Sequence, residues 1–154
     1  METALYRRWL AAHEDAAQRL AGWNPAEEPV PEGLVDAVGF HRTVEERLFF
    51  PRLARYFVGG GPIPLMTAAH RDLAEGPRED AAAWRDAFLL HLRQEDLVLL
   101  PIARLRFTSR EWAALDEQAQ ALWPPGAYGK RRVTPRHAAI DCETPAAGPS
   151  PGGA

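Results

Sequence analysis

The chain contains one pattern twice, and this repeat restricts the fold more than any other feature of the sequence. The segments FHRTVEERLFFP and LHLRQEDLVLLP both match H-x3-E-[ED]-x4-P, where x is any residue. Residues four positions apart in an α-helix lie one turn apart on the same face. Each segment therefore directs an imidazole and a carboxylate to one side of a helix. The two pairs are His41 with Glu45 and His91 with Glu95.

Apolar residues recur with the period of an α-helix along most of the chain, and strand-like alternation is absent from the sequence. Breaks rich in proline and glycine separate the periodic segments, and Trp9 falls on the apolar face of the first one. We expect helices over residues 3–22, 32–57, 63–75, 79–107 and 109–123. Because short connections favour antiparallel neighbours, the predicted fold is all-α, an up-down-up-down four-helix bundle with a short fifth helix.

Two prolines stand inside the repeated segments. Pro51 and Pro101 have no backbone N–H, and a proline ring clashes with the preceding helical turn. We therefore expect the second and fourth helices to kink or to lose their regular geometry near these residues.

The composition changes after residue 123. Six of the last 31 residues are proline and five are glycine, a fraction too high for a packed element. We predict two regions, a helical bundle domain over residues 1–123 and a disordered tail over residues 124–154.

Each of the first four predicted helices carries one histidine among its apolar positions, and two of these helices add a glutamate. Burying four imidazoles and two carboxylates in one layer of the core is costly unless partners compensate them. A pair of cations removes this cost, with about two histidines for each ion and the carboxylates as bridges. The predicted ligands are His13, His41, Glu45, His70, His91 and Glu95.

Three neighbours of this site have open roles. Asp96 directly follows Glu95 and is the alternative second bridging carboxylate. Glu46 and Asp96 either orient ligand imidazoles from outside the site or face solvent. Tyr6 lies two turns before His13 on the same helix face, where it either packs in the core or donates a hydrogen bond toward the site.

Composition argues against several other classes of protein. The net charge is -3 and the pI is near 6, which favours neither a nucleic-acid partner nor a membrane surface. The single cysteine, Cys142, excludes an internal disulfide and a cysteine metal cluster, and a cytoplasmic location is expected. The E-x-x-H pairs of ferritin-like sites, the H-E-x-x-H of zinc proteases and the P-loop are absent from the sequence.

The paired H-x3-E…P segments, together with single histidines on the two other helices, resemble the hemerythrin-like family of HHE cation-binding domains. The resemblance covers roughly residues 5–122. It implies a non-haem di-iron site in a four-helix bundle, with Glu45 and Glu95 as bridging ligands. Members of the family bind O2 or NO, sense iron or oxygen, act on peroxide, or help to repair iron–sulfur clusters.

The sequence departs from the oxygen-carrying hemerythrins at two positions. Those proteins have an H-x3-H pair on the third helix, whereas Ala74 stands four residues after His70, which leaves four histidines instead of five. They also place the second carboxylate five residues after its histidine, where this chain has Asp96.

The predicted function is the binding of O2, NO or a related small oxidant at the 4-His/2-carboxylate centre, for storage, scavenging or sensing. The alternative is a di-iron enzyme that turns over peroxide, O2 or NO in stress defence or iron–sulfur repair. Two iron ions are the predicted cofactors, and manganese or zinc suits the same ligands.

Overall fold

The structure is a computed structural model that describes residues 3–77 and 79–122, and all regular elements in these ranges are helical. The expected all-α class is therefore confirmed for this part of the chain. The elements in chain order are α1 (Ala4–Ala21), α2 (Leu34–Val44), η1 (Glu45–Phe49), α3 (Phe50–Leu53), η2 (Ala54–Tyr56), η3 (Val58–Gly60), α4 (Ile63–Ala74), α5 (Ala81–Gln94), η4 (Glu95–Leu99), α6 (Leu100–Arg106) and α7 (Ser109–Leu122). The predicted tail, 124–154, lies outside the described residues.

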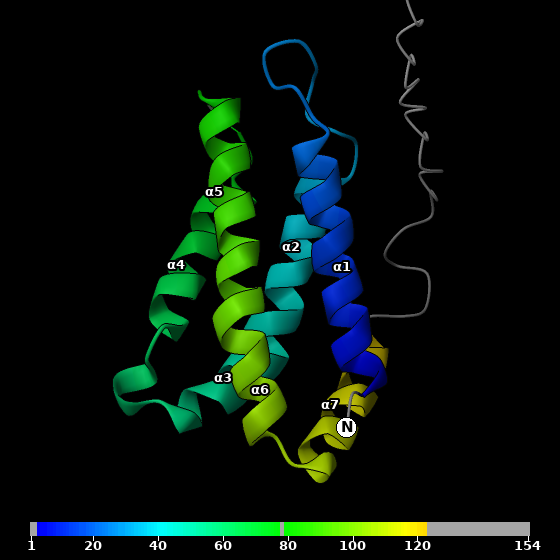
Figure 1. The fold of residues 1–154 in the computed structure, drawn as a ribbon, viewed down its shortest axis with the longest axis vertical. Coiled ribbons are helices and arrows are strands. Elements are labelled where there is room, and N and C mark those ends of the chain that lie inside the picture. The colour runs from blue at the N-terminus through cyan, green and yellow to red at the C-terminus, as the bar shows by residue number, and fades with distance from the viewer. Residues whose placement is uncertain (1–2, 78, 123–154) are drawn as a thin grey trace, which may run out of the picture.

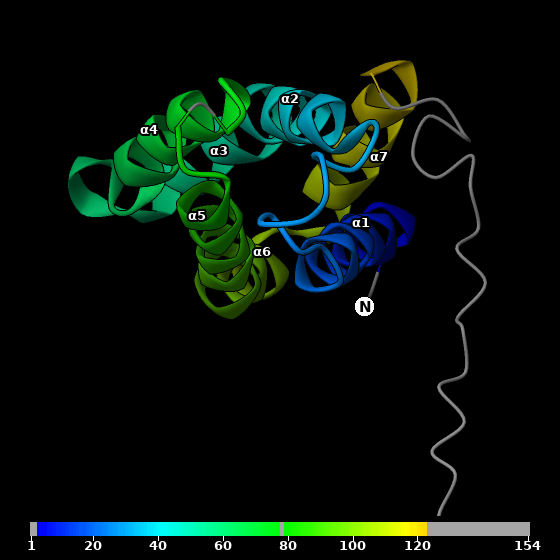
Figure 2. The ribbon, with the colours of Figure 1, turned by 90° about the horizontal axis from the view of Figure 1, so that it is seen from above.

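The long helices lie side by side. In Figure 1 the chain rises along α1, descends through α2 and α3, rises along α4, and descends through α5 and α6. Viewed from above, α1, α5, α4 and α2 surround a common core (Figure 2), and the packed neighbours include α1 with α5, α5 with α4, and α4 with α2. The last helix, α7, packs against α1 and η1 at the lower end. Each of the four long helices thus turns one face toward the same interior.

Side chains cap the starts of three helices. The Thr3 hydroxyl accepts a hydrogen bond from the Tyr6 amide at the start of α1, and Asp80 accepts one from Ala83 at the start of α5. Because Asp80 is the N-cap, α5 begins two residues later than predicted. At α7, the Thr108 hydroxyl accepts from the Glu111 amide while the Glu111 carboxylate accepts from the Thr108 amide, the reciprocal pattern of a capping box.

The second and fourth predicted helices are not regular throughout, and both widen at the same point of the repeated motif. A π-helical turn, η1, follows α2, and a second one, η4, follows α5. The carbonyl of Glu45 accepts from Phe50, five residues ahead, and the carbonyl of Glu95 accepts from Leu100 in the same way. The prolines supply the reason, since residues 51 and 101 have no N–H to donate and their rings need room. The expected irregularity is therefore present as a wider turn that begins at each glutamate.

The buried apolar side chains form two clusters, here called the lower core and the upper core by their places in Figure 1. The buried aromatic members of the lower core are Tyr6, Trp9, Phe49, Phe50, Phe107 and Trp112. Those of the upper core are Trp23, Trp84 and Phe88. On α1, Ala12 belongs to the lower core and Ala16 to the upper core, with His13 between them in the sequence. The fold thus leaves a separate layer between its two apolar halves.

None of the described helices combines the length and the apolar character needed to cross a membrane.

Candidate metal centre

The layer between the two cores contains the six residues that the sequence predicts as ligands, and we call it the polar layer. Each side chain comes from a long helix or from the wide turn that follows it. None of the six is more than 6% exposed. Its members are His13 on α1, His41 on α2, Glu45 on η1, His70 on α4, His91 on α5 and Glu95 on η4.

Five of the six offer ligand atoms that lie within 4.8 Å of one another. These five are His41, Glu45, His70, His91 and Glu95. His13 lies at the edge of this group, with its Nε2 3.5 Å from Oε1 of Glu45 and 3.7 Å from Oε2 of Glu95. The structure therefore brings all six predicted residues together and places one of them to the side.

The four imidazoles form two pairs. The ring centroids of His13 and His41 are 4.8 Å apart, and those of His70 and His91 are 4.6 Å apart. Between the pairs, His41 lies 5.3 Å from His70 and 5.7 Å from His91. The polar layer thus has two ends, each with two histidines.

The two glutamates lie between these ends. Oε2 of Glu95 is 3.1 Å from Nε2 of His41, whereas its Oε1 is 3.2 Å from Nε2 of His91. Oε2 of Glu45 is 3.1 Å from Nε2 of His41 and 3.2 Å from Nε2 of His70. Each carboxylate therefore lies between histidines of both pairs.

Several polar atoms at the centre of the layer have no hydrogen-bond partner among the described residues. They include Nε2 of all four histidines, both oxygens of Glu95 and Oε2 of Glu45. Buried polar groups are normally paired, because an unpaired one costs free energy that water would otherwise supply. Converging, unpartnered imidazole nitrogens and carboxylate oxygens are the donor set of a metal site. The buried cluster can therefore hold a metal ion.

Without a cation, protons must balance the charge of the layer. Burial lowers the pKa of His41, but the negative charges of Glu45 and Glu95 outweigh burial and raise this pKa to about 10. Burial likewise opposes protonation of His70, whose pKa is raised to about 9 by the same two carboxylates. Burial raises the pKa of Glu95, yet the nearby histidines hold it well below its ordinary value. In the metal-free layer, His41 and His70 are thus imidazolium groups beside the carboxylates of Glu45 and Glu95.

The second acidic residue of each motif copy contacts a histidine on a different helix. Oδ1 of Asp96 lies 2.7 Å from Nδ1 of His13, and Oε1 of Glu46 lies 3.2 Å from Nδ1 of His70. Carboxylates in this position fix the orientation of a ligand imidazole and leave Nε2 directed at the metal. Glu95 thus enters the polar layer, whereas Asp96 lies at its edge and contacts the outer nitrogen of His13.

Trp9 is the neighbour of the site that sequence reasoning missed. Its indole N–H donates a hydrogen bond of 2.6 Å to Oε1 of Glu45, and its ring lies against Phe49 with centroids 3.6 Å apart. The sequence predicts Trp9 as a core residue, and it is indeed 1% exposed. Two features of the sequence could have indicated this contact. Trp9 lies one helical turn before His13, and the indole N–H of a buried tryptophan needs a hydrogen-bond acceptor.

No family model, curated protein or solved structure matches this chain. The assignment of the site therefore depends on its own geometry and chemistry.

Two other residues named from the sequence have clear places. Tyr6 is buried in the lower core, with its ring edge-on to Trp112 at 5.8 Å between centroids. Ala74 is the last residue of α4 and packs against the upper core, so the helix continues for one turn beyond His70. Tyr6 thus has one of the two roles that the sequence left open, packing in the core, and residue 74, where oxygen-carrying hemerythrins have a further histidine, lies on a regular helix.

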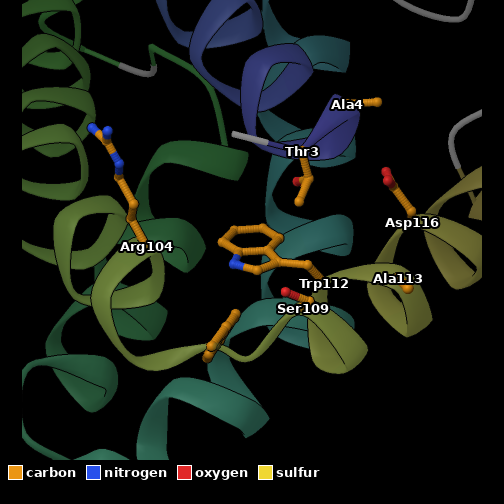
Figure 3. A pocket seen from close by; sticks show the side chains of 8 residues that line it. Thr3, Ala4, Arg104, Ser109, Trp112, Ala113 and Asp116 are labelled. Atoms are coloured by element: carbon orange, nitrogen blue, oxygen red, sulfur yellow. The ribbon is translucent and has the colours of Figure 1, made fainter. Parts of the chain in front are cut away.

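A cavity of about 290 Å³ opens at the lower end of the molecule, away from the polar layer. It is lined by residues of α1, α6 and α7, and Figure 3 shows the Trp112 ring between Thr3 and Ser109. None of the six predicted ligands lines it. This cavity and the candidate metal centre are therefore separate features.

Proposed function

We propose that the chain is a hemerythrin-like four-helix bundle that holds two iron ions in the polar layer and binds O2, NO or a related small oxidant there. One observation carries the proposal. Four buried imidazole nitrogens and two buried carboxylates converge, and none of the four nitrogens has a hydrogen-bond partner in the part of the chain that the structure describes. The alternating run of α1, α2, α4 and α5 in Figure 1 supports the bundle.

Two ions explain the layer better than one. Five residues lie close enough to share a single ion, but His13 contacts only the edge of that group. Its Nε2 is nevertheless buried and unpartnered, which a single ion at the centre leaves unexplained. The division of the Glu95 oxygens between His41 and His91 fits a carboxylate that bridges two ions.

Imidazole and carboxylate ligands suit iron, manganese and zinc. The resemblance of the repeated motif to hemerythrin-like domains favours iron among them. Bound iron would supply the coordination site for the small ligand, and the protein would supply its burial between two apolar cores.

The ligand count leaves room for such a molecule. The six side chains offer four imidazole nitrogens and at most four carboxylate oxygens. Two six-coordinate ions together accept more ligands than these. Asp96 and Glu46 would hold His13 and His70 in place, so that the unfilled positions stay directed into the layer.

Metal analysis with optical spectroscopy tests the proposal. Purified protein is reconstituted with ferrous iron without oxygen, its iron content is measured, and its spectrum is recorded before and after addition of NO and of O2. We expect two irons per chain and a new absorption band with each gas. A content of one iron or none contradicts the dinuclear proposal. Steady-state turnover of peroxide or NO with a reductant favours the enzyme instead of the binding protein.

A further inference from the structure

The two glutamates of the repeated motif are equivalent in sequence but not in their surroundings. Oε1 of Glu45 accepts the indole N–H of Trp9, and both side chains are 1% exposed. Among the described residues, no donor from outside the polar layer is bonded to Glu95, whose oxygens lie 3.1 Å from Nε2 of His41 and 3.2 Å from Nε2 of His91. One carboxylate is therefore held by a group outside the polar layer and the other is not.

Trp9 is built to hold that oxygen in one place. The indole nitrogen only donates, so a carboxylate oxygen is a natural partner and a cation is not. Close packing against Phe49 and an edge-on contact with His13, at 5.9 Å between centroids, fix the ring. A buried, close-packed ring of this kind has little freedom to turn away.

The hydrogen bond also selects which end of the layer each oxygen of Glu45 serves. Oε1, held by Trp9, is 3.5 Å from Nε2 of His13. Oε2 is left for His41 and His70. Without the indole N–H, no hydrogen bond from outside the polar layer fixes the oxygen beside His13.

We propose that Trp9 is a positioning residue that makes the two metal positions unequal, by directing Oε1 of Glu45 to the ion beside His13. The inference rests on the proposed dinuclear function and concerns the metal position beside His13. The ion between His70 and His91 has Glu95 Oε1 and Glu45 Oε2 near it and does not need Trp9. The ion beside His13 depends on the indole, so it binds second and more weakly.

A cobalt titration of three proteins tests this: the unchanged chain, Trp9→Phe, and Trp84→Phe as the matched control. Trp84 is also buried and also donates its indole N–H, but to the Leu73 carbonyl in the upper core at 3.0 Å. The control therefore loses a buried tryptophan and one hydrogen bond without touching a carboxylate. Co2+ is the probe because its visible bands report the geometry of its ligands.

We expect the unchanged chain to bind two Co2+ in unequal steps. Trp9→Phe should keep the first step within about twofold and weaken the second about 10- to 100-fold, the usual effect of losing an outer partner of a metal ligand. The cobalt spectrum of the second step should change in Trp9→Phe, whereas Trp84→Phe should match the unchanged chain in both steps.

Three results overturn the inference. A Trp9→Phe protein with the affinities and spectra of the unchanged chain shows that the indole directs nothing. If both Co2+ binding steps are weakened equally in Trp9→Phe, and Trp84→Phe shows the same weakening, the cause is a general packing effect. An unchanged chain that binds one Co2+ or none contradicts the proposed function as well, so that failure is distinct from the first two.

A measurement on the unchanged chain covers the case in which Trp9→Phe does not fold. The indole N–H signals of 15N-labelled protein are followed while Zn2+ is added. The Trp9 signal should move further with the second equivalent of Zn2+ than with the first, because the first ion reaches only the other oxygen of Glu45, whereas the Trp84 signal should stay in place. A Trp9 signal that moves mainly with the first equivalent, or with neither, overturns the inference.

Discussion

The two copies of the repeated motif form nearly the same local structure in different surroundings. Each ends an α-helix at its glutamate, continues as a π-helical turn and reaches a proline six residues after that glutamate. The copy on α2 has its glutamate held by Trp9, and the copy on α5 has no such donor among the residues that the structure describes. The comparison teaches that the motif places the two buried glutamates, while a residue far away in the sequence makes their surroundings differ.

Replacing either glutamate of the repeated motif should have the largest effect on metal binding and stability. Glu45→Ala and Glu95→Ala should both lose bound metal, because each leaves several buried imidazoles uncompensated. We expect a loss of roughly 3–5 kcal/mol in the stability of the loaded protein for each change. Metal content and thermal unfolding measure the effect, with exposed Glu14→Ala as the control. If only one copy matters for binding, the two copies are not equivalent ligands.

The pH dependence compares the two charge states of the layer. Folding raises the pKa of His41 to about 10 and that of His70 to about 9. Their protonated forms therefore stabilise the metal-free fold fully below about pH 6.5, the unfolded value. This stability is lost as the pH rises through about 9 and 10.

Metal binding has the opposite dependence, because it must displace these protons. Its apparent affinity should rise about tenfold per pH unit for each proton released. Thermal unfolding from pH 6 to pH 10, with and without Zn2+, checks both parts. A metal-free protein that gains stability over this range contradicts the charge assignment.

Replacing the second acidic residue of each motif copy, Glu46 or Asp96, should have a smaller effect on metal affinity. Asp96→Asn should weaken metal binding about tenfold, because it replaces the anion that orients His13 across 2.7 Å. Glu46→Gln should have a smaller effect, since its contact with His70 is longer, at 3.2 Å, and Glu46 also contacts Arg42. Metal titrations of both variants give the ranking. A larger effect for Glu46→Gln reverses the expected order.

The smallest expected change concerns Ala74, one turn beyond His70 on α4. If the layer holds iron as proposed, the loaded, unchanged protein should lose part of its optical signal in each cycle of O2 exposure and evacuation, because four histidines instead of five would surround the proposed ions. Ala74→His should retain more of the signal per cycle. Full recovery by the unchanged chain over several cycles contradicts this prediction and favours an oxygen carrier.

Most of the helical pattern was predictable from the sequence, since periodicity and breakers mark it directly. The first helix was predicted over residues 3–22 and is observed at Ala4–Ala21. The wide turns at Glu45 and Glu95 were predicted only as irregularities near the prolines. A sequence shows which amide is missing, but the alternative hydrogen bond depends on how the turn packs.

The candidate site also has one part that the sequence predicts and one part that it does not. The spacing of His41 and Glu45 places both on one helix face, so their convergence follows from local geometry. The contact between Trp9 and Glu45 joins residues 36 positions apart, and it depends on the rotation of two helices about their axes. No local pattern encodes that rotation, and the indole was therefore predicted only as core.

The polar layer between the lower and upper cores also bears on folding cooperativity. Apolar contacts spread stability evenly only where they are continuous, and here they are interrupted across the middle of four helices. The upper core has fewer buried side chains than the lower core, which α7 also covers. In the metal-free protein, backbone amides around Trp84 and Phe88 should exchange with solvent deuterium by partial opening, ahead of those around Trp9 and Phe49. A cation bound by all four helices ties the two halves together, so exchange at both should then require the same global unfolding.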